Sequence, residues 1–144
     1  MEPIIEIIDR PIERDAYRIR IPSDSGAIVE FSGIVRDMED GLPIRGIEYE
    51  VFREMALAEL SRIAQEIIAR YTLTDFVCVH RCGFVPIHYE AVYVRTVAPR
   101  RREAFDANME FVEKLKQTVP IWKHPVRAET EDKQIADMAV PQKR

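Results

Sequence analysis

The sequence predicts an α+β fold with a mostly antiparallel sheet and two main helices. Three observations support this prediction. Apolar and polar residues alternate over several short segments, which is the pattern of half-buried strands. Two longer segments carry apolar residues at helical spacing. The predicted order is strand, strand, helix, strand, strand, helix, strand, and short loops between consecutive strands favour antiparallel pairing.

The first half of the chain contains the clearest strand. Residues 4–8 form a short apolar segment, and a polar stretch follows it to residue 25. From residue 27 onward one face is predicted to carry Ala27, Val29, Phe31, Gly33 and Val35. Residues 37–41 are predicted to form a turn or loop, and residues 44–52 to form the second strand.

Two segments have helical periodicity. Residues 53–70 carry an apolar stripe made of Ala56, Leu60, Ile63 and Ile67. A second helix is predicted from Pro99 to about Gln117, with a stripe of Phe105, Met109 and Val112. Lys116 occupies the next position of that stripe. Its side chain therefore either extends out to solvent or ends in a partly desolvated pocket. If Lys116 is catalytic, we expect its stem to be largely buried, with its amine at a pocket mouth near Lys123.

The remaining segments complete the predicted domain, which spans residues 1–128. Strands are predicted over residues 76–85 and 91–98, with a connection within residues 83–88. Residues 120–127 are predicted to form the last strand. The polar tail of residues 129–144 is expected to be loosely ordered.

Composition places the chain among soluble globular proteins. Its 144 residues are enough for one domain with a real core, and 47% of them are apolar and 32% charged. No apolar run reaches the length of a membrane span, and the acidic N-terminus does not resemble a secretory signal. A cytoplasmic location is therefore expected.

Charge is unevenly distributed along the chain. The net charge is −4, yet residues 95–127 contain eight Lys and Arg residues against four acids. A basic segment on an acidic protein indicates a site for a small anion, because a phosphate-backbone surface normally needs a more basic domain. We therefore expect neither nucleic acid nor membrane as a partner.

Three candidate metal ligands lie close together in the sequence. Cys78, His80 and Cys82 would share one face of the predicted strand, with the cysteines about 13 Å apart. That separation is too long for a disulfide. Without a second pair of ligands we interpret these residues as buried, expect no metal site, and regard the thiols as free.

A pair of lysines is the strongest candidate for chemistry. Lys116 closes the second predicted helix, and Lys123 lies on the last predicted strand. Pro120 ends the helix between them, so the chain turns and both ammonium groups can converge on one pocket. Two nearby lysines suit an anionic substrate, or a lysine nucleophile whose neighbour lowers its pKa.

Arginines add to this anion chemistry. Arg36 lies where a strand enters a polar loop, so it either faces a site or pairs with Asp37, Glu39 or Asp40. Residues 100–102 are three arginines at the start of the second helix, where the helix dipole disfavours cations. They are either a solvated charge run or a grip for phosphate.

These segments together resemble the large catalytic subunit of molybdopterin synthase. The matching segments are residues 26–36, 49–50, 55–56, 80–83, 101, 104–105 and 115–123, in that order. The resemblance implies a fold of the α/β-hammerhead type and a homodimer. It also implies a small ubiquitin-like sulfur carrier, whose C-terminal Gly-Gly bears a thiocarboxylate, as the partner in a heterotetramer. The implied reaction transfers that sulfur to cyclic pyranopterin monophosphate and makes molybdopterin, with no cofactor.

The resemblance also implies roles for individual residues. Lys116 and Lys123 would be catalytic. The pterin phosphate would be bound by Phe31, Ile34, Val35, Arg36, Arg100, Arg101, His124 and Pro125. The chain departs from the family where Arg100 replaces a histidine, and where His88-Tyr89 replaces a glycine followed by an acid. It also has His124-Pro125 where the family favours Lys or Arg and then Glu, and it lacks the usual C-terminal tryptophan segment. Two alternatives therefore remain: a non-catalytic homologue that dimerises and binds the carrier tail, and a small-anion binding module.

Overall fold

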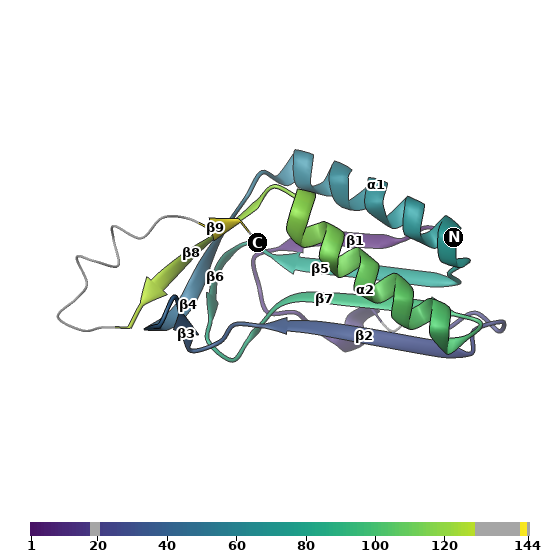
Figure 1. Ribbon diagram of the computed structural model, residues 1–144, viewed down its shortest axis with the longest axis horizontal. Coiled ribbons are helices and arrows are strands. Elements are labelled where there is room, and N and C mark those ends of the chain that lie inside the picture. The colour runs from purple at the N-terminus through teal and green to yellow at the C-terminus, as the bar shows by residue number, and fades with distance from the viewer. Residues whose placement is uncertain (18–20, 129–141, 144) are drawn as a thin grey trace.

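Two helices cover one face of a four-stranded sheet in the computed structural model, which describes residues 1–17, 21–128 and 142–143 (Figure 1). The strand order is β1 (Ile4–Ile8), β5 (Asp75–Arg81), β7 (Glu90–Ala98) and β2 (Ala27–Ile34). Only the β1–β5 pair of this sheet is parallel. The α+β prediction is confirmed, and the apolar segment of residues 4–8 is an additional strand.

Helix α1 (Arg53–Tyr71) follows the sequence prediction closely. Its buried residues are Ala56, Leu60, Ile63, Ala64 and Ile67, which include the whole predicted stripe. The helix ends at Thr72, which adopts a left-handed conformation with φ of 53° and donates its backbone N–H to the carbonyl of Ile68.

The predicted apolar stripe of α2 (Arg101–Thr118) is wrong at two of its three positions, and only Val112 packs against the core. Phe105 and Met109 are 60% and 65% exposed. The buried face consists of Ala104, Ala107, Asn108, Phe111 and Leu115. The small alanines let the helix approach the sheet closely, and a polar residue lies among them. The large apolar residues Phe105 and Met109 therefore do not mark the buried face of this helix.

A second sheet lies beside the first and contains β3 (Met38–Glu39), β4 (Leu42–Val51), β8 (Ile121–Arg127) and β9 (Gln142–Lys143) in that order. Strand β6 (Gly83–Pro86) also pairs with β4. The single strand predicted over residues 76–85 is thus two strands that belong to different sheets. Gly83 makes the break, with φ of 79°, a conformation that glycine adopts without strain.

Strands β3 and β4 form a tight hairpin where the sequence predicted only a turn or loop. Its two central residues are Asp40 and Gly41, with φ of 52° and 76°. Positive φ at both positions defines a type I′ turn, and Asp-Gly is one of the sequences that favour it. The hairpin pairs Glu39 with Leu42 and so fixes the direction of the Glu39 side chain.

The other face of the first sheet is covered by the N-terminal segment. Tyr17, at the end of a 3-10 turn over Arg14–Tyr17, packs with Ile8, Val77, Val79 and Tyr93 in a second apolar cluster. No helix in the described part of the chain is long and apolar enough to span a membrane. The expected loose order of residues 129–144 lies largely outside the described residues, although Gln142–Lys143 pair with β8 as a strand.

Candidate active site

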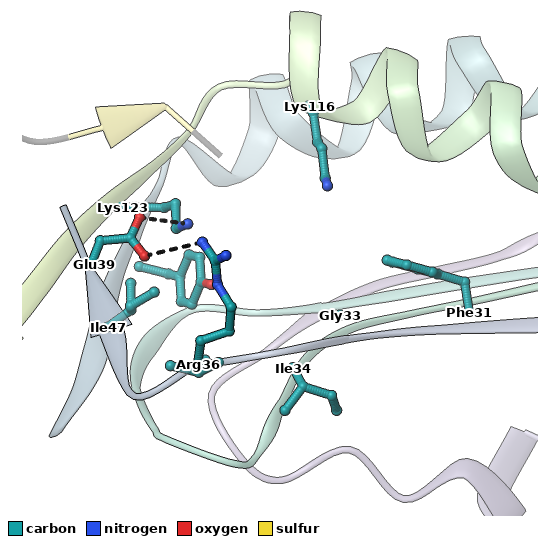
Figure 2. Close-up of a pocket in the computed structure, with 10 residues that line it drawn as sticks. Phe31, Gly33, Ile34, Arg36, Glu39, Ile47, Lys116 and Lys123 are labelled. Atoms are coloured by element: carbon teal, nitrogen blue, oxygen red, sulfur yellow. Dashed lines mark hydrogen bonds and ion pairs between the residues drawn. The ribbon is translucent and has the colours of Figure 1, made fainter. Parts of the chain in front are cut away.

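A pocket of about 290 Å³ opens where the two sheets meet, beneath the C-terminal end of α2 (Figure 2). Strand β2 and the residues after it supply one wall, β4 and β8 supply another, and α2 supplies Lys116. The lining residues are Phe31, Gly33, Ile34, Val35, Arg36, Glu39, Ile47, Tyr49, Lys116 and Lys123. Six of the ten residues that we predicted from the sequence are thus together in one cavity.

Lys123 projects into this pocket from β8. Its partner in the antiparallel ladder is Tyr49, another lining residue. The Lys123 side chain is only 16% exposed, and its Nζ lies 3.2 Å from Oε1 of Glu39. The contact with the buried carboxylate fixes the position of the ammonium group in the pocket.

Lys116 reaches the same pocket from the last turn of α2. We expected its stem to be largely buried, and that expectation is wrong, because the residue is exposed. Leu115, its neighbour, occupies the buried face instead. Lys116 nevertheless lines the pocket with Lys123, and Figure 2 shows its amine pointing from the helix toward the cavity.

The sequence left open whether Arg36 faces a site or pairs with a nearby acid, and in the structure it does both. It lines the pocket, and its Nη2 lies 3.7 Å from Oε2 of Glu39. The Arg36 side chain is 77% exposed. A cation that is so accessible and so loosely paired can turn toward an incoming anion at little cost.

Arg100 and Arg101 lie elsewhere. They line a separate hollow at the N-terminal end of α2, together with Gly26 and Pro99. Fifteen residues of helix separate Arg101 from Lys116, which corresponds to about 22 Å along the axis. We expected Arg36 and Arg101 to reach one anion, and a single subunit does not bring them together.

His124 and Pro125 are also outside the pocket. Both lie on β8 beyond Lys123. His124 is the next residue along the strand, so its side chain points to the opposite face from that of Lys123. His124 Nε2 lies 3.0 Å from Oε1 of Glu50, and Pro125 pairs with Ile47 in the ladder. Neither residue contributes to the lining of the cavity in the described structure.

Glu39 was not predicted as a site residue. It was considered only as one possible partner of Arg36, because residues 37–41 were interpreted as a turn or loop. The Asp-Gly pair that follows was the available signal, since it predicts a two-residue hairpin and therefore an ordered side chain at position 39. Ile47 and Tyr49 were predicted as strand residues, and only the fold places them at the cavity.

Three cations and one carboxylate line the pocket, so its chemistry is that of an anion site. The described residues contain no group of three His, Cys, Asp or Glu side chains that could hold a metal ion. Burial raises the pKa of the Cys78 thiol to about 12, which disfavours the thiolate that metals bind. Cys78 and His80 lie on β5, whereas Cys82 follows the end of that strand.

The departure at residues 88–89 has a structural counterpart. His88 adopts φ of 73°, in the left-handed region that glycine occupies without strain. Its backbone N–H donates to the carbonyl of Val35, which holds the connection between β6 and β7 against the pocket wall. The position therefore keeps the backbone geometry of a glycine while carrying an imidazole.

Comparison with known proteins agrees with the resemblance. The chain matches the family model described as MoaE protein over residues 7–118. It is 37% identical over 122 residues to a molybdopterin synthase catalytic subunit of Staphylococcus epidermidis, with 84% of this chain and 81% of the relative covered. A relative of the same name from Pyrococcus abyssi is 34% identical over 143 residues, with 97% of each chain covered.

A solved structure shows the same fold. Molybdopterin synthase from Staphylococcus aureus superimposes with a TM-score of 0.81 at 35% identity, covering 87% of this chain and 92% of that chain. The matches in sequence and in structure extend over most of the chain, and the family model covers β2, β4 and α2 of the pocket. The chain therefore belongs to the MoaE protein family, the family of these molybdopterin synthase catalytic subunits.

Proposed function

We propose that this protein is the catalytic subunit of a molybdopterin synthase and acts as a sulfurtransferase. The observation that carries the proposal is the convergence of Lys116, Lys123 and Arg36 on one pocket, from three different elements. The names of the relatives support an enzyme of molybdopterin biosynthesis. The substrate would be cyclic pyranopterin monophosphate, whose phosphate matches the positive charge of the pocket.

In the proposed reaction the pocket binds two anions. Arg36 at the mouth holds the substrate phosphate, and the thiocarboxylate of a small ubiquitin-like carrier enters near Lys116. The carrier sulfur forms a bond to a substrate carbon and displaces an oxygen substituent from that carbon. Water then cleaves the bond between the carrier carbonyl and the sulfur, so the carrier tail leaves as a carboxylate and the sulfur stays on the substrate. A second carrier supplies the second sulfur of the dithiolene in the same way. The ammonium group of Lys123 stabilises negative charge that develops during transfer, because it is already fixed in place by Glu39.

The proposed assembly is a homodimer with one carrier bound to each subunit. The relatives are named as catalytic subunits, which supports an enzyme with more than one kind of subunit. Arg100 and Arg101 lie too far from Lys116 to act at the same pocket within one chain. If they bind substrate, they do so at the pocket of the partner subunit.

The first experiment is a sulfur-transfer assay with a thiocarboxylated carrier ending in Gly-Gly. The unmutated protein should convert the pterin phosphate to its dithiolene product. A wild type that binds the carrier but transfers no sulfur would favour the non-catalytic homologue. A wild type that binds phosphate but no carrier would favour the anion-binding module.

Substitution of Lys116 tests the assignment of its amine. Lys116→Ala should lower sulfur transfer by at least about a hundredfold and leave folding and carrier binding intact, because Lys116 is exposed and its removal strands no buried charge. The matched control is Lys114→Ala, which removes a lysine from the same helical turn outside the pocket. Because Lys114 pairs with Glu110, circular dichroism must show that both variants are folded before their activities are compared. Equal activity of the two variants would exclude a catalytic Lys116.

A further inference from the structure

Glu39 is the one acidic side chain that is buried in the described part of the chain, at 8% exposure. It lies inside an anion pocket, where its charge opposes the binding of the substrate phosphate. A buried carboxylate that opposes substrate binding is expected to have a second effect that favours the reaction. Its contacts with the pocket cations indicate what that role is.

The backbone around Glu39 is held on both sides. The type I′ turn at Asp40 and Gly41 places it in β3, and Nη1 of Arg127 donates to its carbonyl oxygen at 3.1 Å. Its side chain is thus presented to the pocket by two antiparallel ladders, β3 with β4 and β4 with β8. Such support is what precise orientation of a functional group requires.

The two carboxylate oxygens bind different cations. Oε1 accepts a hydrogen bond from Lys123 Nζ at 3.2 Å, and Oε2 lies 3.7 Å from Arg36 Nη2. Figure 2 shows both contacts as dashed lines that meet at the one carboxylate. The Lys123 contact is buried and short, whereas the Arg36 contact is long and largely exposed, so the second is much easier to break.

We propose that Glu39 is a positioning residue, which fixes the Lys123 ammonium group in the pocket and holds Arg36 at the mouth until the substrate phosphate replaces it. The role of this pair in sulfur transfer rests on the function proposed above. In the bound state Glu39 keeps Lys123, and Arg36 exchanges the carboxylate for the phosphate. Glu39 therefore weakens anion binding, but it restricts the Lys123 ammonium group to the position from which it acts in sulfur transfer.

Two substitutions of Glu39 separate the effect of the position of its carboxylate from the effect of its charge. Glu39→Asp keeps the charge but shortens the side chain by one carbon–carbon bond, about 1.5 Å, which breaks the contact with Lys123. Glu39→Gln keeps the length and removes the charge. Asp40→Asn is the matched control, because it removes the same charge from the exposed neighbour in the same turn, and asparagine tolerates positive φ.

Position is tested by the reactivity of Lys123. Trace acetic anhydride labels lysine amines, and mass spectrometry gives the rate at Lys123 relative to Lys116 in the same molecule. We expect Glu39→Asp to raise this ratio at least about threefold, because the ammonium group loses its buried partner. Asp40→Asn should leave it unchanged. An unchanged ratio in Glu39→Asp would overturn the proposal.

Charge is tested with inorganic phosphate as the probe, by calorimetric titration of the full chain. Glu39→Gln should bind phosphate about three- to tenfold more tightly than wild type, because one opposing charge leaves a partly buried site. Glu39→Asp and Asp40→Asn should stay within about twofold of wild type. If Glu39→Gln bound phosphate no more tightly than Asp40→Asn, the proposed competition for Arg36 would be wrong.

Turnover connects these effects to the reaction. Glu39→Asp should lower kcat about tenfold with little change in KM, and Glu39→Gln should lower both kcat and KM. A kcat for Glu39→Asp equal to that of Asp40→Asn would contradict the positioning role. If the wild type transfers no sulfur, the proposed function fails, yet labelling and phosphate binding still decide whether Glu39 positions Lys123.

Discussion

Asn108 lies on the buried face of α2 and ties the helix to the sheet beneath it. Its Nδ2 has three acceptors within 3.3 Å: the carbonyls of Val29 and Val94, and Oγ1 of Thr96. Thr96 in turn donates to the carbonyl of Ala104. Because these hydrogen bonds form only at one position of the helix along β2 and β7, the buried amide fixes that position. An apolar side chain would allow the helix to shift along the sheet.

Replacement of Asn108 tests this connection. Asn108→Ala should lower the free energy of unfolding by about 2 kcal/mol, because it removes buried hydrogen bonds and leaves a small cavity. Urea titration followed by circular dichroism measures the loss. Glu113→Ala, on the exposed side of the same helix, is the control and should change stability by less than about 0.5 kcal/mol.

Individual side chains also show how far the sequence predicts the site. The lysine pair and Arg36 were predicted because their residue types and the turn at Pro120 suffice to indicate an anion pocket. Glu39 was not, because its role depends on a hairpin that brings it against a strand far along the chain. Arg101 was assigned to the same anion because a sequence does not show at which end of a helix a pocket lies.

At the scale of elements, the two helices are joined by a charged cluster. Glu110 of α2 accepts hydrogen bonds from Arg70 and Tyr71 at the end of α1, and it pairs with Lys114 one turn further along α2. Burial alone would raise the pKa of Glu110. The bonds from Tyr71, Arg70 and Lys114 outweigh burial and lower that pKa to about 2.

The low pKa of Glu110 makes the contact between α1 and α2 sensitive to acid. A carboxyl group whose folded-state pKa is lowered stabilises the protein above its ordinary pKa, and it loses that contribution as the pH falls toward the folded value. Glu110→Gln should therefore be less stable than wild type at pH 7 by about 1–2 kcal/mol, since the group is partly exposed. The difference should shrink as the pH falls from about 4.5 to about 2.

Urea titrations of both proteins across this pH range measure the effect. Glu113→Gln makes the same change on the exposed side of α2 and should show little difference from wild type at any pH. A stability difference for Glu110→Gln that is constant from pH 7 to pH 2 would show that packing, and not the charge, holds the helices together.

Elements differ in how well the sequence predicts them. Helix α1 was predicted with its buried face because that face is uniformly apolar. The face of α2 was missed because it is built from alanines and an asparagine, which allow close approach but carry little hydrophobic signal. The break between β5 and β6 was missed because both strands are apolar, and only Gly83 marks the change of sheet.

At the scale of the molecule, the described residues of one subunit form two separate cationic hollows. One contains Lys116, Lys123 and Arg36, and the other contains Arg100 and Arg101 at the opposite end of α2. Exposed apolar residues lie at the second hollow and one turn beyond it on α2, namely Phe105, which lines it, and Met109. A homodimer with an interface in this region would cover them, and we keep the predicted dimer, which light scattering at micromolar concentration tests.

In a dimer, the two hollows could form parts of the same substrate site. With two-fold symmetry, the arginines of each subunit can complete the lysine pocket of the other, although about 22 Å separates them within one chain. Arg101→Ala and Lys116→Ala homodimers should then each lose sulfur transfer. A heterodimer with one variant in each subunit should recover about half of the wild-type activity, because one of its two sites has both residues intact.

Differently tagged subunits, coexpressed and purified through both tags, provide this heterodimer. The control pairs a Lys116→Ala subunit with a wild-type subunit, which retains one intact site wherever the arginines act. If the doubly variant heterodimer is as inactive as its parents while the control is active, Arg101 acts within its own chain or through the fold. The lysine pocket would then bind the phosphate without it, and Arg36, whose carboxylate contact is loose and exposed, would be the arginine that carries substrate affinity.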